Sequence, residues 1–212
     1  MTTTTMTTPA TTTPTATSTV GVYLAGFEVF APDGPAIAER MRATCRRYGL
    51  EPISPLDKGA DADQAEADQG PALEGEALAD LIYANNIAMI ERADAILANL
   101  NHFRGPDPDA GTCFEVGYAV ARGKASYVYA SDGATAVERT RDFFGPVTPD
   151  GAGGFTDADG FTVENFGAPF NLMLSSSSTV VLGDFEACVA RLAADAAAGL
   201  VVPRAAVVST GA

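Results

Sequence analysis

The stretch "DAILANLNHFRGPDPDAGTCFEVGYAVARGKASYVYA", residues 94–130, holds the pattern that decides the fold. It begins with a short apolar run, passes through a polar loop with two prolines into a segment of helical spacing, and ends with a second apolar run. Short apolar runs bounded by turn residues are typical of buried strands, and a helix between two of them is typical of parallel strand pairing. The stretch therefore predicts a parallel strand–helix–strand unit.

The same alternation extends to both sides of this unit. Because alternating strands and helices favour a parallel sheet with helices on both faces, we expect a doubly wound α/β sandwich with five strands. The other expected strands are "VGVYLAG" (20–26), "LEPISPLD" (50–57) and "STVVLGD" (178–184), and the other expected helices cover residues 32–49, 76–93 and 185–199.

Two segments have a different character. Residues 1–19 are mostly threonine with two prolines, a composition that predicts a disordered tail. Residues 59–76 are acidic and rich in alanine and glycine, which predicts a loop. We therefore expect a Thr-rich tail followed by one domain over residues 20–212.

Composition and charge exclude several classes of partner. With 13 Lys and Arg against 27 Asp and Glu, the formal net charge is −14, which repels nucleic-acid phosphates and anionic lipid. Apolar runs stay shorter than the roughly 18 residues of a membrane span. We expect small neutral ligands, with no nucleic acid and no membrane as partners.

The cysteines and the first basic residue bear on the compartment. Cys45, Cys113 and Cys188 are odd in number and widely spaced, which fits neither a disulfide framework nor a structural zinc site. The first basic residue is Arg40, so the charged start of a secretory signal is missing. Both observations predict a cytoplasmic protein.

Familiar cofactor and metal motifs are not matched. In "GVYLAGFE", residues 21–28, Phe27 and Glu28 occupy the positions where a phosphate-binding loop needs Lys and Ser or Thr. "DADG", residues 157–160, would need a glutamate at the twelfth position for calcium, but Ala168 stands there. His102 is the single histidine, and we expect it in a surface loop. No metal and no cofactor is expected.

Two carboxylates remain as candidates for chemistry, Asp109 and Glu115. Parallel sheets bind ligands beyond the carboxyl ends of their strands, where the loop over residues 101–110 is expected. Thr112 and Glu115 match a capping box at the start of a helix, so capping is one role for Glu115. Asp109 could be a loop aspartate favoured by the helix dipole. The other role is catalytic, with one carboxylate attacking an electrophilic carbon and the second holding or protonating the substrate.

Three segments, taken in order, resemble the nucleoside 2-deoxyribosyltransferase family. They are "VYLAG", "DLIYANNIAMIERADAILANLNHFRGPDPDAGTCFEVGYAVARGK" and "ENFGAPFNLML", and the combination of D-x-G-T-x-x-E-x-G-Y-A with a later N-L-M carries the resemblance over residues 20–192. It implies a flavodoxin-like sheet and transfer of 2-deoxyribose between nucleobases through a covalent glycosyl-enzyme ester. The implied partners are 2′-deoxynucleosides and free nucleobases.

The resemblance also implies residue roles. Glu115 matches the nucleophile, Asp109 the acid that contacts the nucleoside, and Tyr23 the tyrosine that orients the nucleophile. Asn171 and Met173 match residues that enter a neighbouring subunit's site, so the resemblance implies a homo-oligomer, built on dimers, with shared active sites.

Asn86 departs from several members of that family, which have aspartate on this helix. An amide can hydrogen-bond a base but supplies no carboxylic proton, so Asp109 is the better candidate for protonating the base. Two further substrate contacts are expected at Gly26 and Phe27, at the end of the first strand. An apolar wall against water is expected too, and its candidates are Phe27, Phe30, Phe161 and Phe166.

Two alternatives stay open. The same family contains hydrolases of deoxynucleoside 5′-monophosphates, which need serines and an arginine near the first strand. Acidic and apolar residues in "AGFEVFAPDG", residues 25–34, argue against a phosphate there, whereas the serine run over residues 175–178 keeps this function open. A nucleoside-binding module without catalysis is the third interpretation, because fold does not determine function.

Overall fold

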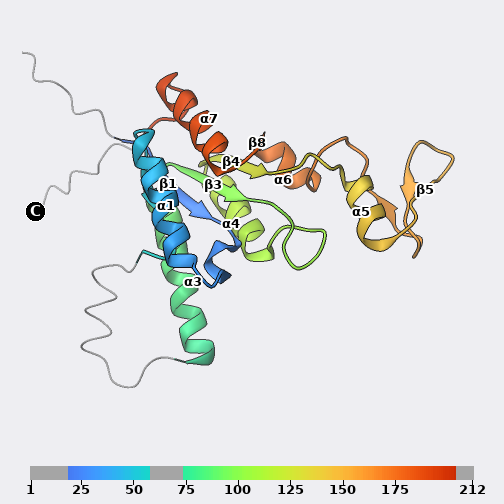
Figure 1. The fold of residues 1–212 in the computed structure, drawn as a ribbon, viewed down its shortest axis with the longest axis horizontal. Coiled ribbons are helices and arrows are strands. Elements are labelled where there is room, and N and C mark those ends of the chain that lie inside the picture. Colours follow the sequence, from blue (N-terminus) through green and yellow to red (C-terminus); the bar gives the residue numbers. More distant parts are fainter. Residues whose placement is uncertain (1–18, 58–73, 204–212) are drawn as a thin grey trace, which may run out of the picture.

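The computed structural model describes residues 19–57 and 74–203, and its centre is a five-stranded sheet (Figure 1). The strand order is β2-β1-β3-β4-β8, and every neighbouring pair is parallel. This confirms the predicted sheet, which has the flavodoxin-like order with its switch point between β1 and β3. The strands are β1 (Gly21–Ala25), β2 (Glu51–Ile53), β3 (Ala95–Asn99), β4 (Ala125–Ala130) and β8 (Thr179–Leu182).

Some predictions fall on other parts of the chain. The predicted tail, apart from Thr19, and residues 58–73 of the predicted loop lie outside the described residues. Gly75, also in that predicted loop, belongs to a helix that begins one residue before the predicted start at Glu76. Within residues 19–57 and 74–203, no helix is both long enough and apolar enough to span a membrane.

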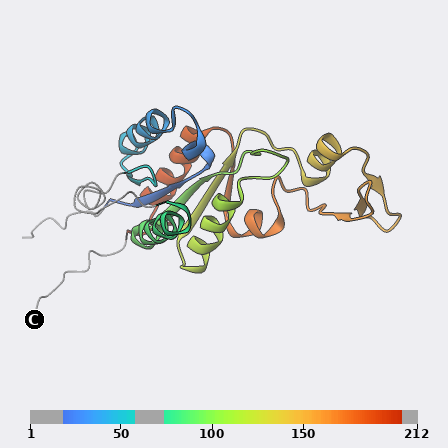
Figure 2. The ribbon, with the colours of Figure 1, turned by 90° about the horizontal axis from the view of Figure 1, so that it is seen from below.

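Helices cover both faces of the sheet, as Figure 2 shows. The α1 and α7 helices pack on one face, where Val22, Leu24 and Leu97 meet Cys45 and Cys188. On the other face lie α3, α4 and α6, whose side chains pack on the alternate strand residues. Their bounds are α1 (Gly34–Arg47), α3 (Gly75–Arg92), α4 (Ala110–Ala121), α6 (Leu172–Ser177) and α7 (Phe185–Ala197).

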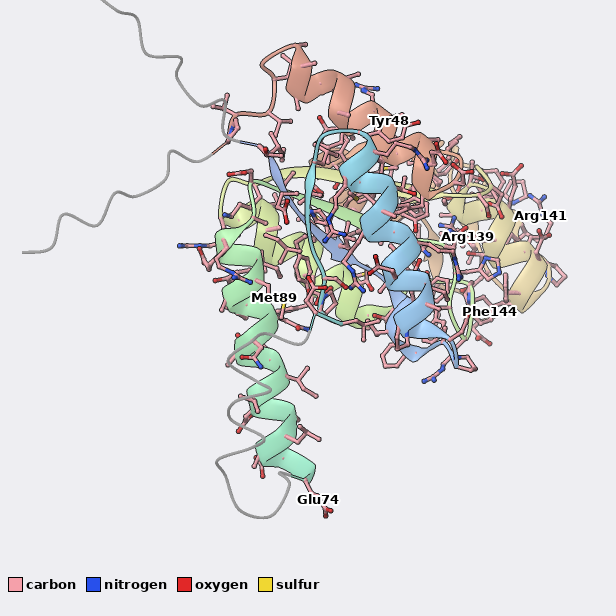
Figure 3. The ribbon with its side chains drawn as sticks, turned by 60° about the vertical axis from the view of Figure 1, so that its left-hand side comes forward. Tyr48, Glu74, Met89, Arg139, Arg141 and Phe144 are labelled. Atoms are coloured by element: carbon pink, nitrogen blue, oxygen red, sulfur yellow. The ribbon has the colours of Figure 1, made fainter. Side chains whose placement is uncertain are left out.

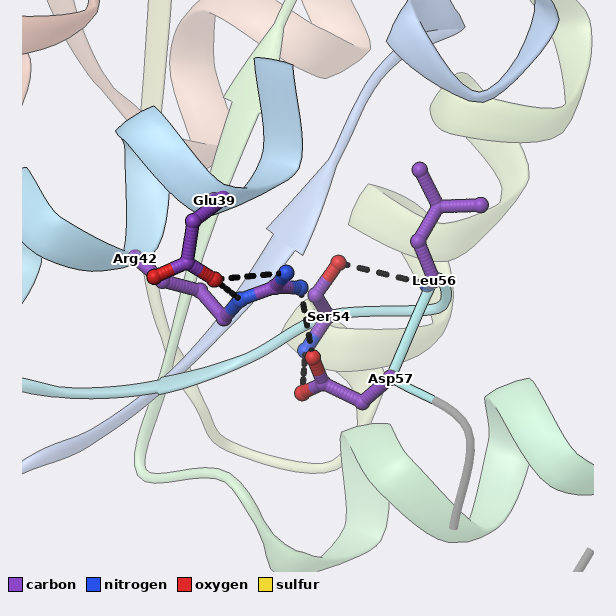
Figure 4. Close-up of polar contacts among 5 residues, drawn as sticks. All are labelled: Glu39, Arg42, Ser54, Leu56 and Asp57. Carbon is purple, nitrogen blue, oxygen red and sulfur yellow. Dashed lines mark hydrogen bonds and ion pairs between the residues drawn. The ribbon is translucent and has the colours of Figure 1, made fainter. Parts of the chain in front are cut away.

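The strand after α1 is shorter than predicted. Residues 50–57 were expected as a strand, but β2 covers only Glu51–Ile53 and a turn follows it. The Ser54 amide donates to Asp57 Oδ2 at 2.8 Å, and Asp57 Oδ1 pairs with Arg42 of α1 at 2.7 Å (Figure 4). Pro55 cannot donate a ladder hydrogen bond, which favours the turn. The turn is thereby tied to α1.

Residues 131–170, in which no helix or strand was predicted from the sequence, contain regular structure. They form α5 (Ala136–Phe144) and a small antiparallel sheet of β5 (Thr148–Pro149), β6 (Phe155–Thr156) and β7 (Thr162–Val163). Thr135 and Glu138 make a capping box at the start of α5. This excursion extends away from the main sheet (Figures 1 and 2).

The α3 helix extends beyond the body of the molecule. Ile90 near its end is buried against the sheet, but the apolar side chains of its first half are exposed. In Figure 3 the helix runs from Met89, beside the body, out to Glu74. The exposed side chains are Leu78, Leu81, Ile82 and Tyr83, between 40% and 56% accessible.

Candidate active site

The Glu115 carboxylate lies where three elements meet. Glu115 is on the second turn of α4, and its Oε1 accepts a hydrogen bond from the Tyr23 hydroxyl of β1 at 2.6 Å. The Asn86 side-chain amide of α3 donates to the same oxygen at 3.3 Å. Parallel packing of α3 and α4 on β1 therefore joins side chains that are 29 and 92 positions from Glu115.

The two oxygens of this carboxylate differ. Both hydrogen bonds fall on Oε1, while Oε2 accepts none within residues 19–57 and 74–203 and is not sealed from solvent. Tyr23 is completely buried, so its hydroxyl is held in one position beneath the carboxylate. The hydrogen bonds to Oε1 thus orient the Glu115 carboxylate, and Oε2 stays accessible to a ligand.

Burial is the main influence on the ionisation of this pair. It raises the pKa of Glu115 above the usual range, and the negative charge of Asp109 adds to the rise, whereas the Tyr23 and Asn86 hydrogen bonds lower it. Burial and the Glu115 carboxylate likewise raise the pKa of Tyr23 far above its ordinary value. Tyr23 consequently remains a hydroxyl donor at any working pH.

The start of α4 corrects the predicted capping box. The helix begins at Ala110, and its N-cap is Asp109, whose Oδ2 accepts from the Thr112 amide at 2.8 Å and from the Thr112 hydroxyl at 3.0 Å. Thr112 is therefore the third helical residue and not the cap, and Glu115 is too far along the helix to reach the free amides. Asp109 therefore caps the helix, and capping does not account for Glu115.

Aromatic side chains stack beside the end of β1. Phe27 and Phe103 are nearly parallel, with ring centroids 4.9 Å apart, and Phe30 lies on Phe103 at 5.6 Å. The Arg104 guanidinium covers Phe103 at 4.7 Å. Phe103 was not among the residues predicted from the sequence, although its place in the loop after β3 could have pointed to it.

The other two wall candidates lie elsewhere. Phe161 and Phe166 are on the excursion, each 71% exposed, and take no part in this stack.

Gly26 lies between β1 and the stack, and a side chain there would collide with the Glu28 carboxylate. His102 is exposed as predicted, and its ring meets the edge of Phe143 at 5.5 Å.

Asn171 and Met173 lie at the start of α6. Asn171 caps this helix by accepting from the Met173 amide at 3.0 Å, and its side-chain amide donates to Glu164 at 2.6 Å. Met173 is 70% exposed. Neither residue hydrogen-bonds Glu115 in the described part of the chain.

A cavity of about 290 Å³ lies between the excursion and the loop after β3. Asn171 lines it together with Asp107 and Arg139, and Arg139 is labelled in Figure 3.

Side chains that could bind a metal ion do not cluster in the described part of the chain. Among the described residues, no group of three or more His, Cys, Asp or Glu side chains is arranged to hold a metal ion. The polar groups that converge are the Glu115 carboxylate with its two donors, and Asp109 at the start of the same helix. This arrangement suits nucleophilic attack by a carboxylate.

Comparisons with known proteins identify the family of this chain. A profile of the family described as nucleoside 2-deoxyribosyltransferase matches residues 22–173. The chain belongs to this family. The match includes every candidate residue from Tyr23 to Met173.

Three proteins similar to this deoxyribosyltransferase-type enzyme each match more than two thirds of its length. A 2-desoxiribosyltransferase from Leishmania mexicana is 35% identical, with a TM-score of 0.61 over 82% of this chain and 97% of the other. An uncharacterised protein from Schizosaccharomyces pombe is 29% identical over 162 residues, which cover 72% of this chain and 74% of the relative. A 2-deoxyribosyltransferase from Bacillus psychrosaccharolyticus matches at 16% identity, with a TM-score of 0.47 over 78% and 88% of the two chains.

Proposed function

We propose that this protein exchanges nucleobases on 2-deoxyribose, with Glu115 as the nucleophile that carries the sugar between them. The observation that carries the proposal is the asymmetric carboxylate: two donors hold Oε1, and Oε2 stays open. Family membership supports the substrate class, which is 2′-deoxynucleosides and free nucleobases.

In the first half of the reaction, Oε2 of ionised Glu115 attacks the anomeric carbon of the deoxyribose. The bond from this carbon to the base nitrogen breaks, and its electron pair leaves with the base, which takes up a proton. Asp109 is the candidate donor of that proton and must carry it when the base leaves, because Asn86 is an amide and has none to give at ordinary pH. The product is a deoxyribosyl ester of Glu115.

In the second half, a nitrogen of the incoming base attacks the anomeric carbon from the face that the first base left. The ester bond breaks, its electron pair returns to Glu115, and the incoming base loses a proton to Asp109. Two displacements give net retention of configuration, the pattern of retaining glycosidases. No metal or cofactor enters either half.

Tyr23 and Asn86 contribute in both halves. In the free enzyme they stabilise negative charge on Oε1, and in the ester the same donors bind the carbonyl oxygen that Oε1 becomes. They therefore hold the carboxyl plane fixed while Oε2 forms and breaks its bond. Preorganised donors of this kind lower the barrier because they need no rearrangement during the reaction.

The substrate needs groups beyond this core. Phe27, in its stack with Phe103, supplies an apolar wall that favours a bound base over water, and Gly26 leaves room beside it. We assign Asn171 and Met173 to the sugar site of a neighbouring subunit, since Met173 is exposed and neither residue hydrogen-bonds Glu115 in the described part of the chain. The protein is accordingly proposed to work as a homo-oligomer.

An exposed apolar surface on α3 and α4 supports assembly into an oligomer. Soluble monomers rarely leave large contiguous apolar patches uncovered. This apolar patch consists of the exposed side chains of α3 together with Phe114 of α4, which is 53% exposed. It borders the site, because Phe114 immediately precedes Glu115 and its ring centroid lies 6.2 Å from that of Tyr83. Burying it between subunits would close one side of the site.

One experiment tests the function directly. The purified protein is incubated with deoxyinosine and adenine, or with thymidine and adenine, and the products are separated by chromatography. Deoxyadenosine formed together with the free donor base supports exchange. Free base without a new nucleoside would point to hydrolysis, and unchanged substrates would point to a binding module. A parallel incubation with deoxynucleoside 5′-monophosphates tests the hydrolase of that substrate class.

A further inference from the structure

A second carboxylate, Glu28, is bound into the opposite face of the sheet from Glu115. Glu28 lies in η1 (Phe27–Phe30), the short 3-10 helix after β1. Its Oε1 accepts from the Asn99 amide at the end of β3 at 2.6 Å and from the Tyr129 hydroxyl of β4 at 3.2 Å. One side chain thus joins the ends of three neighbouring strands.

The hydrogen bonds continue from Asn99 into the loops around the site. Asn99 Oδ1 accepts from the backbone amide of Asn101 at 3.0 Å and from its side-chain amide at 2.7 Å. Asn101 Oδ1 then accepts from the Ser131 amide at 2.8 Å and from its hydroxyl at 2.7 Å. The loop after β3 is therefore fixed both to η1 and to the loop after β4.

This network is closed from water at its centre. Asn99 and Tyr129 are 5% and 4% exposed, and Glu28 Oε2 is the one buried side-chain oxygen or nitrogen of the described residues without a partner. The carboxylate fits because residue 26 is glycine, where any side chain would overlap Oε2. A buried acceptor without a donor costs free energy, so the arrangement is not explained by stability alone.

The loops that Glu28 joins carry the groups that the reaction needs. The loop after β3 runs through Phe103 to Asp109, and η1 carries Phe27, which stacks on Phe103. We propose that Glu28 is a positioning residue of the base-exchange reaction. Through its hydrogen bonds to the Asn99–Asn101–Ser131 chain, it fixes the positions of the aromatic wall and of Asp109. The inference rests on the proposed function.

The chain offers a matched control. Tyr127 and Tyr129 lie two positions apart on β4, face the same side of the sheet, and are each 4% exposed. Tyr129 donates to Glu28, whereas Tyr127 donates to Asp195 of α7 at 2.8 Å, away from the loops of the site. Tyr127→Phe therefore removes an equivalent buried hydroxyl without touching the network.

The experiment compares Glu28→Ala, Glu28→Gln, Tyr129→Phe and Tyr127→Phe in the full chain. For each variant, kcat/KM for base exchange is measured well below the melting temperature, and amide hydrogen exchange is followed at Asn101 and Ser131. We expect Glu28→Ala to lower kcat/KM about 10- to 100-fold, the usual effect of misplaced catalytic groups. Glu28→Gln should recover most of the loss, because its amide oxygen still accepts from Asn99 and Tyr129.

Amide exchange separates positioning from general destabilisation. Glu28→Ala and Tyr129→Phe should speed exchange at Asn101 and Ser131, whereas Tyr127→Phe should leave these amides protected. Equal losses of kcat/KM in Glu28→Ala and Tyr127→Phe at matched folded fractions would overturn the proposal, as would unchanged protection of both amides in Glu28→Ala. If the wild type exchanges no bases, the proposed function fails, and the amide protection alone decides the link between Glu28 and these loops.

Discussion

Replacing Tyr23 by phenylalanine removes one hydroxyl and leaves the ring in the core. The lost group donates the 2.6 Å hydrogen bond to Glu115 Oε1, so only the weaker 3.3 Å bond from Asn86 remains on that oxygen. Because the Tyr23 bond lowers the pKa of Glu115 against the effect of burial, its removal raises that pKa further. The variant should therefore need a higher pH to ionise its nucleophile.

The size of the effect follows from the kind of bond. A hydrogen bond to a charged group contributes about 1.5–3 kcal/mol, which corresponds to roughly a 10- to 150-fold change in the protonation equilibrium of Glu115. Activity requires the ionised form, so the acid limb of the profile of kcat/KM against pH should move to higher pH. At pH values below the pKa of Glu115, kcat/KM of Tyr23→Phe should be lower than that of the wild type by about this 10- to 150-fold factor. At higher pH, where Glu115 is ionised in both proteins, the remaining difference in kcat/KM should reflect only the lost orientation of the carboxylate.

The assay is base exchange followed by chromatography across a series of buffers, with the folded fraction checked at each pH. Tyr118→Phe is the matched control, because Tyr118 lies on the same helix as Glu115 and donates to Glu91 at an equal 2.6 Å. Its profile should coincide with that of the wild type. An acid limb that stays in place in Tyr23→Phe, or moves to lower pH, would refute the assigned role of Tyr23.

Three further predictions concern the carboxylates and the assembly. Glu115→Gln should abolish exchange without lowering the melting temperature at pH 7. Burial raises the pKa of Glu115 in the folded state, so the charge of Glu115 opposes folding as the pH rises. The exchange assay measures the loss of activity, and calorimetry measures the melting temperature. Asp109→Asn should keep the helix cap, whereas Asp109→Ala should lose about 1 kcal/mol of unfolding free energy, and both should slow exchange alike if the acid acts on the base. Equal mixtures of inactive Glu115→Ala and Asn171→Ala chains should regain about a quarter of the wild-type sites in a two-fold dimer once subunits exchange, and an inactive mixture with mass-spectrometric proof of exchange would exclude a shared site.

Local pattern in the sequence was sufficient for the architecture. The runs that became β1, β3, β4 and β8 are short, apolar and bounded by turn residues, a pattern typical of strands in a parallel sheet that is covered on both faces. The residues of β1, β3 and β4 are mostly buried, whereas those of the edge strand β8 are only partly buried or exposed. Helical spacing located α1, α3, α4 and α7, because the apolar face of a helix usually packs on the sheet. In α3 only the end near Ile90 is buried, whereas Leu78, Leu81 and Ile82 stay exposed. The small sheet within residues 131–170 escaped prediction because its strands are only two residues long, whereas the T-x-x-E pattern of Thr135 and Glu138 could have pointed to α5.

The choice between capping and chemistry at α4 depended on contacts between distant parts of the chain. Thr112 and Glu115 have the spacing of a capping box, but the helix begins two residues before Thr112, where Asp109 competes better for the free amides. The roles of Glu115 and Glu28 depend on partners 92, 71 and 101 positions away, which are brought together only by strand order. A sequence pattern reports how each segment buries its own apolar face, whereas hydrogen bonds between side chains on different elements are set by how those elements pack.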